Sequence, residues 1–203
     1  MPASAFIKKN PDALTQHLDV LVELAECYAE GGDWDRAGEC YRRAAEVAPE
    51  SPLPIVGLAT LARRQGRPAE AAKGFQEALE KDANCSAAYE GLAWVYHRQG
   101  AHPAACELYL KALELDGENL QALEGLCEVS AVTGESLQAR KWLEAYLDRH
   151  PGEPRAMMCL AALDARDKGP SEARRTLLSI LALEPDNARA AELLAQLDEP
   201  AGR

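Results

Sequence analysis

The sequence lacks the features that mark membrane and exported proteins. It contains no run of 18 apolar residues, so no segment is predicted to span a membrane. The opening stretch, MPASAFIKKNPDAL, lacks the apolar centre of a signal peptide. These two absences predict a cytoplasmic protein.

The residues and motifs that carry most chemistry are also missing. There are four histidines, none of them in an HExxH motif, and the chain has no GxSxG motif and no phosphate-binding loop. The six cysteines form no CxxC pair, and no Cys/His spacing suits zinc. We therefore expect no catalytic residues, no metal site and no cofactor. The cysteines are expected to be reduced thiols that act as small apolar residues.

Basic residues are too few for a nucleic-acid-binding surface. Lys and Arg number 22 against 33 acidic residues, and the net charge is −11. Such a surface repels a phosphate backbone, so nucleic acid is not expected as a partner.

What the chain does have is a repeat of constant length. Five stretches of 34 residues follow each other without insertion, and a half-unit begins at residue 188. The five are 18–51, 52–85, 86–119, 120–153 and 154–187. A fixed period of this length indicates one elongated domain in which each unit packs on its neighbours.

Within each unit the apolar positions follow helical spacing. We number the positions of a unit as slots 1 to 34; slots 4, 7, 8 and 11 lie on one helix face, and so do slots 20, 24 and 27. Each unit is therefore predicted to hold two helices, A and B. Slots 8 and 20 are small, whereas slot 24 is large in every unit: Tyr41, Phe75, Tyr109, Leu143 and Leu177.

Glycine and proline divide the helices. Slot 15 holds Gly32, Gly66, Gly100 and Gly134, where a left-handed residue can end helix A. Proline begins several B helices, where no backbone hydrogen bond is lost. The resulting class is all-α.

The units share a pattern: Leu-Ala at slots 7 and 8, Gly at 15, Ala at 20, an aromatic residue at 24 and Pro at 32. This pattern resembles that of the tetratricopeptide repeat family. The resemblance covers residues 18–187 and implies a right-handed α-solenoid superhelix of antiparallel helix pairs. A capping helix is expected at 188–198, which completes a solenoid at 18–198. Slot 11 departs from the family with Asp164, which we expect at a loosened edge beside water or an arginine; a functional carboxylate is the alternative.

Both ends lie outside the repeat register. Residues 1–17 form an arm, with a long first helix expected to begin near Asp12. Phe6 and Ile7 in the arm either cap the solenoid or insert into a neighbour to make a dimer. Residues 199–203 are a short tail, which is either natural or the start of a linker.

The resemblance also implies where a partner binds, because helix A slots 2, 5, 9, 12 and 13 face the concave groove in this family. Trp94 with surrounding basic residues has the composition of an interface hot spot, and acidic residues flank it. The predicted peptide-binding residues are Arg63, Arg64, Glu90, Trp94, His97, Arg98, Glu124 and Glu128. This centre suits an extended peptide or a helix with one acidic anchor.

Two known variants of the family do not fit. Co-chaperones that hold the carboxyl terminus of heat-shock chaperones place Lys and Asn at slots 5 and 9, where this chain has Val22 and Glu26, then Val56 and Thr60. Glycosyltransferase-linked arrays carry Asn at slot 6, which holds Gly in three units here.

The predicted function is a non-catalytic adaptor or scaffold that binds a peptide or protein segment. Alternatives are the recognition arm of a larger enzyme, such as a glycosyltransferase, and a self-assembling structural array. The chain itself is expected to be a monomer or a weak homo-oligomer.

Overall fold

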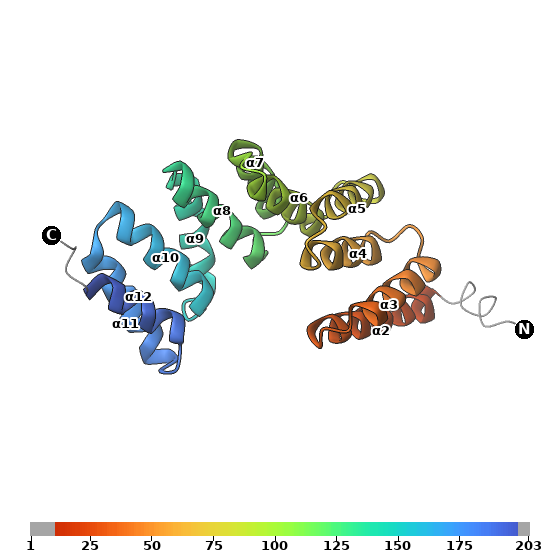
Figure 1. The fold of residues 1–203 in the computed structure, drawn as a ribbon, viewed down its shortest axis with the longest axis horizontal. Helices are drawn as coiled ribbons and strands as arrows, with labels where there is room; N and C mark the ends of the chain where they lie inside the picture. The colour runs from red at the N-terminus through yellow and green to blue at the C-terminus, as the bar shows by residue number, and fades with distance from the viewer. Residues whose placement is uncertain (1–10, 199–203) are drawn as a thin grey trace, which may run out of the picture. The chain divides into compact units, whose positions relative to one another are not determined.

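The computed structural model describes residues 11–198, and every regular element in that part of the chain is an α-helix (Figure 1). The predicted all-α class is confirmed. The helices are α2 (Pro11–Glu30), α3 (Trp34–Val47), α4 (Leu53–Arg64), α5 (Pro68–Lys81), α6 (Ser86–Arg98), α7 (His102–Leu115), α8 (Leu120–Thr133), α9 (Leu137–Arg149), α10 (Pro154–Asp167), α11 (Pro170–Leu183) and α12 (Ala188–Asp198).

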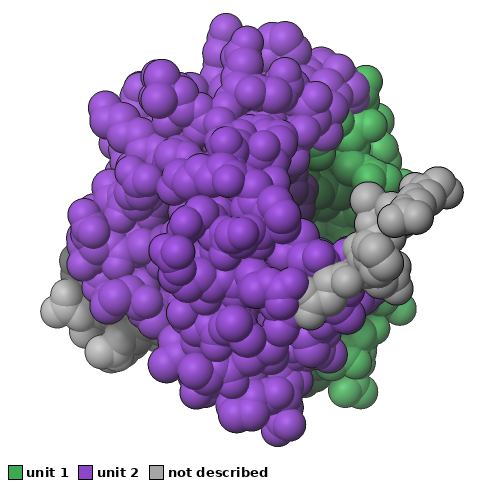
Figure 2. Space-filling model, turned by 90° about the vertical axis from the view of Figure 1, so that its left-hand side faces the viewer, with its two compact units in different colours: residues 1–99 green, residues 100–203 purple. Residues whose placement is uncertain are grey.

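The helices fall into two compact units, which Figure 2 shows in green and purple. Unit 1 comprises residues 1–99 and contains α2 to α6. Unit 2 comprises residues 100–203 and contains α7 to α12. The division falls inside the third repeat, between its A helix and its B helix.

Each unit is built by packing helices that are near in sequence. In unit 1, α2 packs on α3, α4 packs on α5, and α4 also contacts both α2 and α3. In unit 2, α10 packs on α11 and also contacts α8 and α9, while α12 covers α11. This is the arrangement expected of helix pairs that bury their apolar faces against neighbouring pairs.

The helices begin and end close to the glycines and capping residues of the sequence. All four slot-15 glycines have φ between 72° and 83°, in the left-handed region that the prediction required. Gly169 ends the A helix of the fifth repeat one position later, with φ 95°. At the start of α3, the Asp33 carboxylate accepts a hydrogen bond from the Arg36 backbone N–H at 3.1 Å.

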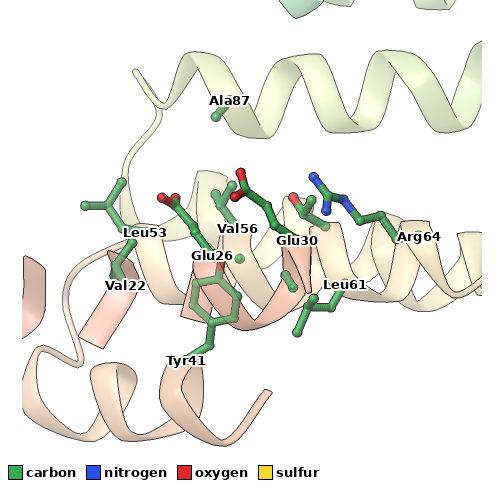
Figure 3. A pocket seen from close by; sticks show the side chains of 12 residues that line it. Val22, Glu26, Glu30, Tyr41, Leu53, Val56, Leu61, Arg64 and Ala87 are labelled. Carbon is green, nitrogen blue, oxygen red and sulfur yellow. The ribbon is translucent and has the colours of Figure 1, made fainter. Parts of the chain in front are cut away.

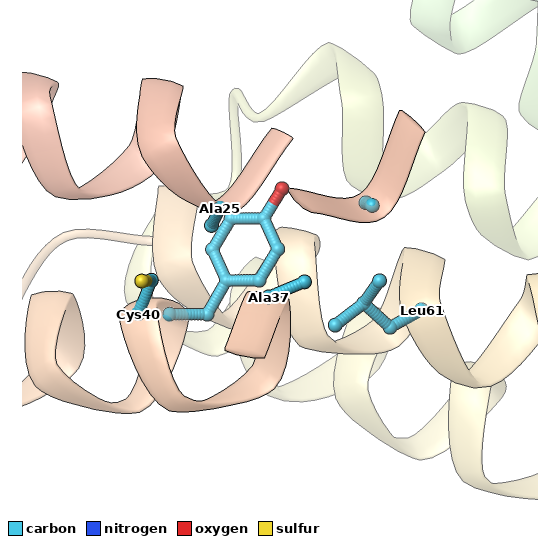
Figure 4. Close-up of a cluster of buried hydrophobic side chains, with 6 residues drawn as sticks. Ala25, Ala37, Cys40 and Leu61 are labelled. Carbon is cyan, nitrogen blue, oxygen red and sulfur yellow. The ribbon is translucent and has the colours of Figure 1, made fainter. Parts of the chain in front are cut away.

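The core consists of the small and large slots that the repeat predicts. Every slot-20 alanine and every slot-24 side chain is at most 5% exposed. One cluster in unit 1 includes Ala25, Ala37, Cys40 and Leu61 together with Tyr41 (Figure 4). The small residues permit close helix approach, and the large slot-24 side chain fills the space beside them.

Three buried glycines at slot 6 explain how consecutive repeats stack. A Cβ added to Gly57, Gly91 or Gly125 would lie 2.2 Å from the slot-24 ring of the preceding repeat. The rings are those of Tyr41, Phe75 and Tyr109 respectively. In the following units slot 24 becomes Leu143 and Leu177, and slot 6 becomes Cys159 and Leu193. An aromatic residue at slot 24 is therefore followed by Gly at slot 6 of the next repeat. A smaller leucine at slot 24 is followed by a slot-6 residue that has a side chain.

The first helix differs from the expectation in one respect. Slot 7 is buried at Leu92 and Leu126, but Leu24 on α2 is 42% exposed, because no helix pair precedes α2 in the described part of the chain. The expected long first helix is present and begins at Pro11. Phe6 and Ile7, for which we expect a cap or a dimer contact, lie outside the described residues.

No helix among the described residues is long and apolar enough to cross a membrane. The cytoplasmic location stays a prediction.

Candidate functional site

Unit 1 contains a hollow of about 320 Å³ between α2 and α4, with one residue of α6 at its edge (Figure 3). It is lined by Val22, Glu26, Ala29, Glu30, Tyr41, Leu53, Val56, Gly57, Thr60, Leu61, Arg64 and Ala87. Nine of these twelve residues occupy helix A slots 2, 5, 9, 12 or 13. We call the surface formed by these slots the A-helix face.

The floor of the hollow is made by the stacking of repeats 1 and 2. Tyr41 rises from α3 between α2 and α4, and its ring rests where Gly57 has no side chain (Figure 3). Tyr41 is only 5% exposed, yet it lines the hollow. Burial and the nearby Glu26 carboxylate raise the pKa of Tyr41 to about 12, although the Arg64 guanidinium acts in the opposite direction.

Three charged side chains stand on the walls. Glu26 and Glu30 lie one turn apart on α2, and Glu30 lies between Glu26 and Arg64 of α4 (Figure 3). Within residues 11–198, none of these three side chains forms an ion pair or a side-chain hydrogen bond. Apolar side chains of Val22, Leu53 and Val56 lie around the Glu26 end (Figure 3).

A second cluster joins α4 and α6. Arg63 Nη1 donates to Glu90 Oε1 at 2.8 Å, and both side chains are less than one-fifth exposed. The Arg63 guanidinium carbon lies 5.5 Å from the centre of the Trp94 ring, and that of Arg98 lies 6.0 Å from it. Both distances are within the range of a cation–π interaction.

The structure therefore brings together four of the predicted binding residues in that cluster. Arg63 is already neutralised by Glu90, whereas Arg98 is exposed and remains the basic group beside Trp94. His97 is half-buried on the same helix, and Arg64 lies in the hollow instead. Their role in binding stays a prediction.

The other two predicted residues, Glu124 and Glu128, lie on α8 in unit 2. Glu124 makes a two-point ion pair with Arg155 of α10, with atoms 2.8 and 2.5 Å apart. Glu128 is exposed.

Sequence reasoning does not identify the floor of the hollow. The slot pattern places Tyr41 in the core, and it marks Gly57 only as a position without the asparagine of the glycosyltransferase-linked arrays. The signal that could have found the floor is the pairing of an aromatic slot 24 with a glycine at the next slot 6.

Asp164 does not lie at a loosened edge. It is 4% exposed, and its carboxylate accepts a hydrogen bond from Arg140 at 2.8 Å and pairs with Lys168 at 3.0 Å. The expected arginine is present, but the carboxylate is buried in unit 2. The Arg140 pair joins α9 to α10, whereas Lys168 lies at the end of α10 itself.

Two of the cysteines lie together, since the thiols of Cys127 on α8 and Cys159 on α10 are in hydrogen-bond contact. Cys40, Cys85 and Cys127 are buried, while Cys27 is exposed. In the described part of the chain, no group of three or more His, Cys, Asp or Glu side chains is placed to hold a metal ion.

Two family models described as tetratricopeptide repeat match the chain, one at residues 18–51 and the other at 56–119. No curated protein sequence matches it significantly.

Several solved structures have a fold similar to that of this chain. The pilF protein of Pseudomonas aeruginosa is 22% identical, with a TM-score of 0.74 over 91% of this chain and 84% of that one. The thermophilic repeat protein TTC0263 of Thermus thermophilus is 19% identical, with a TM-score of 0.72 over 89% and 98%. The first repeat domain of Spaghetti (RPAP3), bound to the HSP90 peptide SRMEEVD, is 23% identical, with a TM-score of 0.51 over 59% and 95%.

Proposed function

This chain is a tetratricopeptide repeat protein, and we propose that it is a non-catalytic scaffold or adaptor that holds a segment of another protein on its A-helix face. Repeats of this kind serve in general as protein-interaction scaffolds. The observation that carries the proposal is the hollow in unit 1, whose walls come from the A-helix face.

The chemistry of this surface suits a peptide better than a reaction. Its walls combine apolar side chains with charges that have no partner within residues 11–198. A bound segment would cover the apolar groups and pair with the charges without displacing ion pairs. The hollow is open to solvent and does not provide the closed, water-excluding environment that favours catalysis.

The cluster around Trp94 supplies a second contact on the same face of unit 1. A tryptophan flanked by arginine is the composition most enriched among residues that dominate binding energy. Because Arg63 is paired with Glu90, Arg98 is the cation that would meet an acidic residue of the ligand. The bound segment is thus expected to reach from the hollow toward Trp94.

The test is to place a photo-crosslinking amino acid at Thr60 in the hollow, at the exposed Gln99 beside Arg98, and at the exposed Glu39 of α3. Irradiation in lysate of the source cells should join the same protein to the first two positions and not to the third. Mass spectrometry of the joined peptides would show whether one continuous segment of that protein meets both positions. Equal crosslinking at all three, or crosslinking only between copies of this chain, would refute peptide binding on the A-helix face.

A further inference from the structure

We infer that the hollow between α2 and α4 receives a lysine or arginine side chain from a partner protein, within a segment that also offers an apolar residue beside it. The inference rests on the proposed function and specifies the ligand at one end of the A-helix face. It names an occupant of opposite charge to the acidic anchor expected near Arg98.

The Glu26 end of the hollow is negatively charged. Glu26 and Glu30 are four residues apart on α2, so their Cβ atoms lie about 5–6 Å apart on one face of the helix. Two carboxylates so placed repel each other by a few tenths of a kcal/mol in the free protein. A cation between them would remove that repulsion and gain two ion pairs.

Tyr41 supplies a hydrogen-bond acceptor that is separate from the carboxylates. The Tyr41 side chain is 95% buried and points into the hollow, and its hydroxyl has no hydrogen-bond partner among residues 11–198 (Figure 3). Its phenol keeps its proton at neutral pH, so the oxygen lone pairs can accept from an ammonium or guanidinium N–H. The hydroxyl meets the hollow, so a donor from a ligand can take the place of the solvent there.

The wall of the hollow beside Glu26 is apolar. Val22, Leu53 and Val56 lie beside Glu26, and Leu53 is 48% exposed. Lysine and arginine carry a long aliphatic stem below the charged group, which packs on such a wall while the head reaches the carboxylates. A volume of about 320 Å³ is at the small end of ligand pockets, which suits one side chain rather than a whole small molecule.

Arg64 makes the two ends of the hollow differ in charge. It lies beyond Glu30, on the side away from Glu26 (Figure 3). A cationic side chain is therefore favoured at the Glu26 end and repelled at the Arg64 end. The sign of the effect of removing Arg64 consequently distinguishes a basic ligand from an acidic one.

The experiment is selection of a displayed library of random twelve-residue peptides on the full chain. We expect the selected peptides to be enriched in Lys or Arg next to an apolar residue. The variant E26Q/E30Q should lose this enrichment, while E39Q/E46Q should keep it. The control removes the same charge from two exposed positions on α3, so a general attraction of basic peptides to an acidic protein would affect both variants alike.

A synthetic peptide from the selection then gives the magnitudes. E26Q/E30Q should weaken its binding by at least about tenfold, as expected for loss of charge pairs at a partly covered site. R64Q should strengthen it by about twofold to threefold. Circular dichroism of each variant shows that the helices are retained.

Three other outcomes would contradict the inference. Enrichment of acidic peptides, with binding weakened by R64Q, overturns this inference and leaves the proposed function standing. Basic peptides selected equally by E26Q/E30Q overturn it as well. Selection of no peptide on the A-helix face overturns the proposed function together with it.

Discussion

Gly91 contacts Phe75 of the preceding repeat. Adding a single methyl group at Gly91 therefore tests how consecutive repeats stack. An alanine at position 91 would place its Cβ 2.2 Å from Cζ of Phe75 and 2.4 Å from Cε1 and Cε2. Carbon atoms normally pack at about 3.5–4.0 Å, so the ring or the helix must move by more than about 1 Å. Phe75 is fully buried and has no open space to move into.

Two effects of opposite sign decide the result of Gly91→Ala. Gly91 lies inside α6, where alanine is favoured over glycine by about 1 kcal/mol. Overpacking a close-packed core costs about 1–3 kcal/mol, and an overlap with three ring atoms belongs at the upper end of that range. We therefore expect the variant to lose about 2 kcal/mol of stability.

Urea unfolding followed by circular dichroism measures this change. Gly31→Ala is the control, because its Cβ would meet nothing closer than 3.5 Å, and it should shift stability by less than about 0.5 kcal/mol. Adding Phe75→Leu should rescue Gly91→Ala, since Leu143 goes with Cys159 at the equivalent slots. The coupling in a double-mutant cycle should exceed about 1 kcal/mol. A Gly91→Ala protein as stable as the wild type, or more stable, would refute the stacking argument.

The remaining predictions concern other parts of the chain. Trp94→Ala and Arg98→Glu should each remove ligand binding with nearly unchanged melting, and unfolding of either would make Trp94 structural rather than a binding residue. Asp164→Ala should cost about 1.5–3 kcal/mol in urea unfolding because it removes a charge-assisted hydrogen bond from the half-buried Arg140, which keeps Asp167 as its other partner, and a cost below about 0.5 kcal/mol would contradict a structural role for the pair. The pKa of Tyr41 near 12 exceeds that of an unfolded tyrosine, so its contribution to stability is complete below pH 10 and is lost as pH rises toward 12. Tyr41→Phe should make stability less steep over that pH range, and an unchanged slope would count against a raised pKa.

The sequence predicts most of the fold because each structural requirement is repeated five times. A glycine at slot 15 indicates little when met once, but four glycines at the same slot indicate the left-handed helix ends that the structure has. The same holds for alanine at slot 20 and a large residue at slot 24. Leu24 is the exception, because its exposure depends on what precedes the first repeat rather than on the repeat itself.

The candidate site is less predictable from the sequence for a physical reason. Helical spacing identifies which residues share a face, and the hollow does lie on the predicted face. Spacing does not identify partners across neighbouring helices, which depend on how the A helices align in space. Arg63 and Glu90 are 27 residues apart, and their pairing removes one cation from the basic centre that the sequence suggested.

The chemistry at slots 5 and 9 shows why family membership alone does not define the ligand. Where the heat-shock co-chaperones of the family place Lys and Asn to hold a carboxylate, this chain has Val22 and Glu26 in its first repeat. Those residues line the hollow here, and Glu30 one turn later adds a second acid. In this chain, slot 6 and slot 24 fix how consecutive repeats stack. Replacing a cation at slot 5 by valine and a neutral amide at slot 9 by a carboxylate leaves that stacking intact but reverses the charge that a bound side chain must carry, so specificity has to be argued from these residues rather than from the fold.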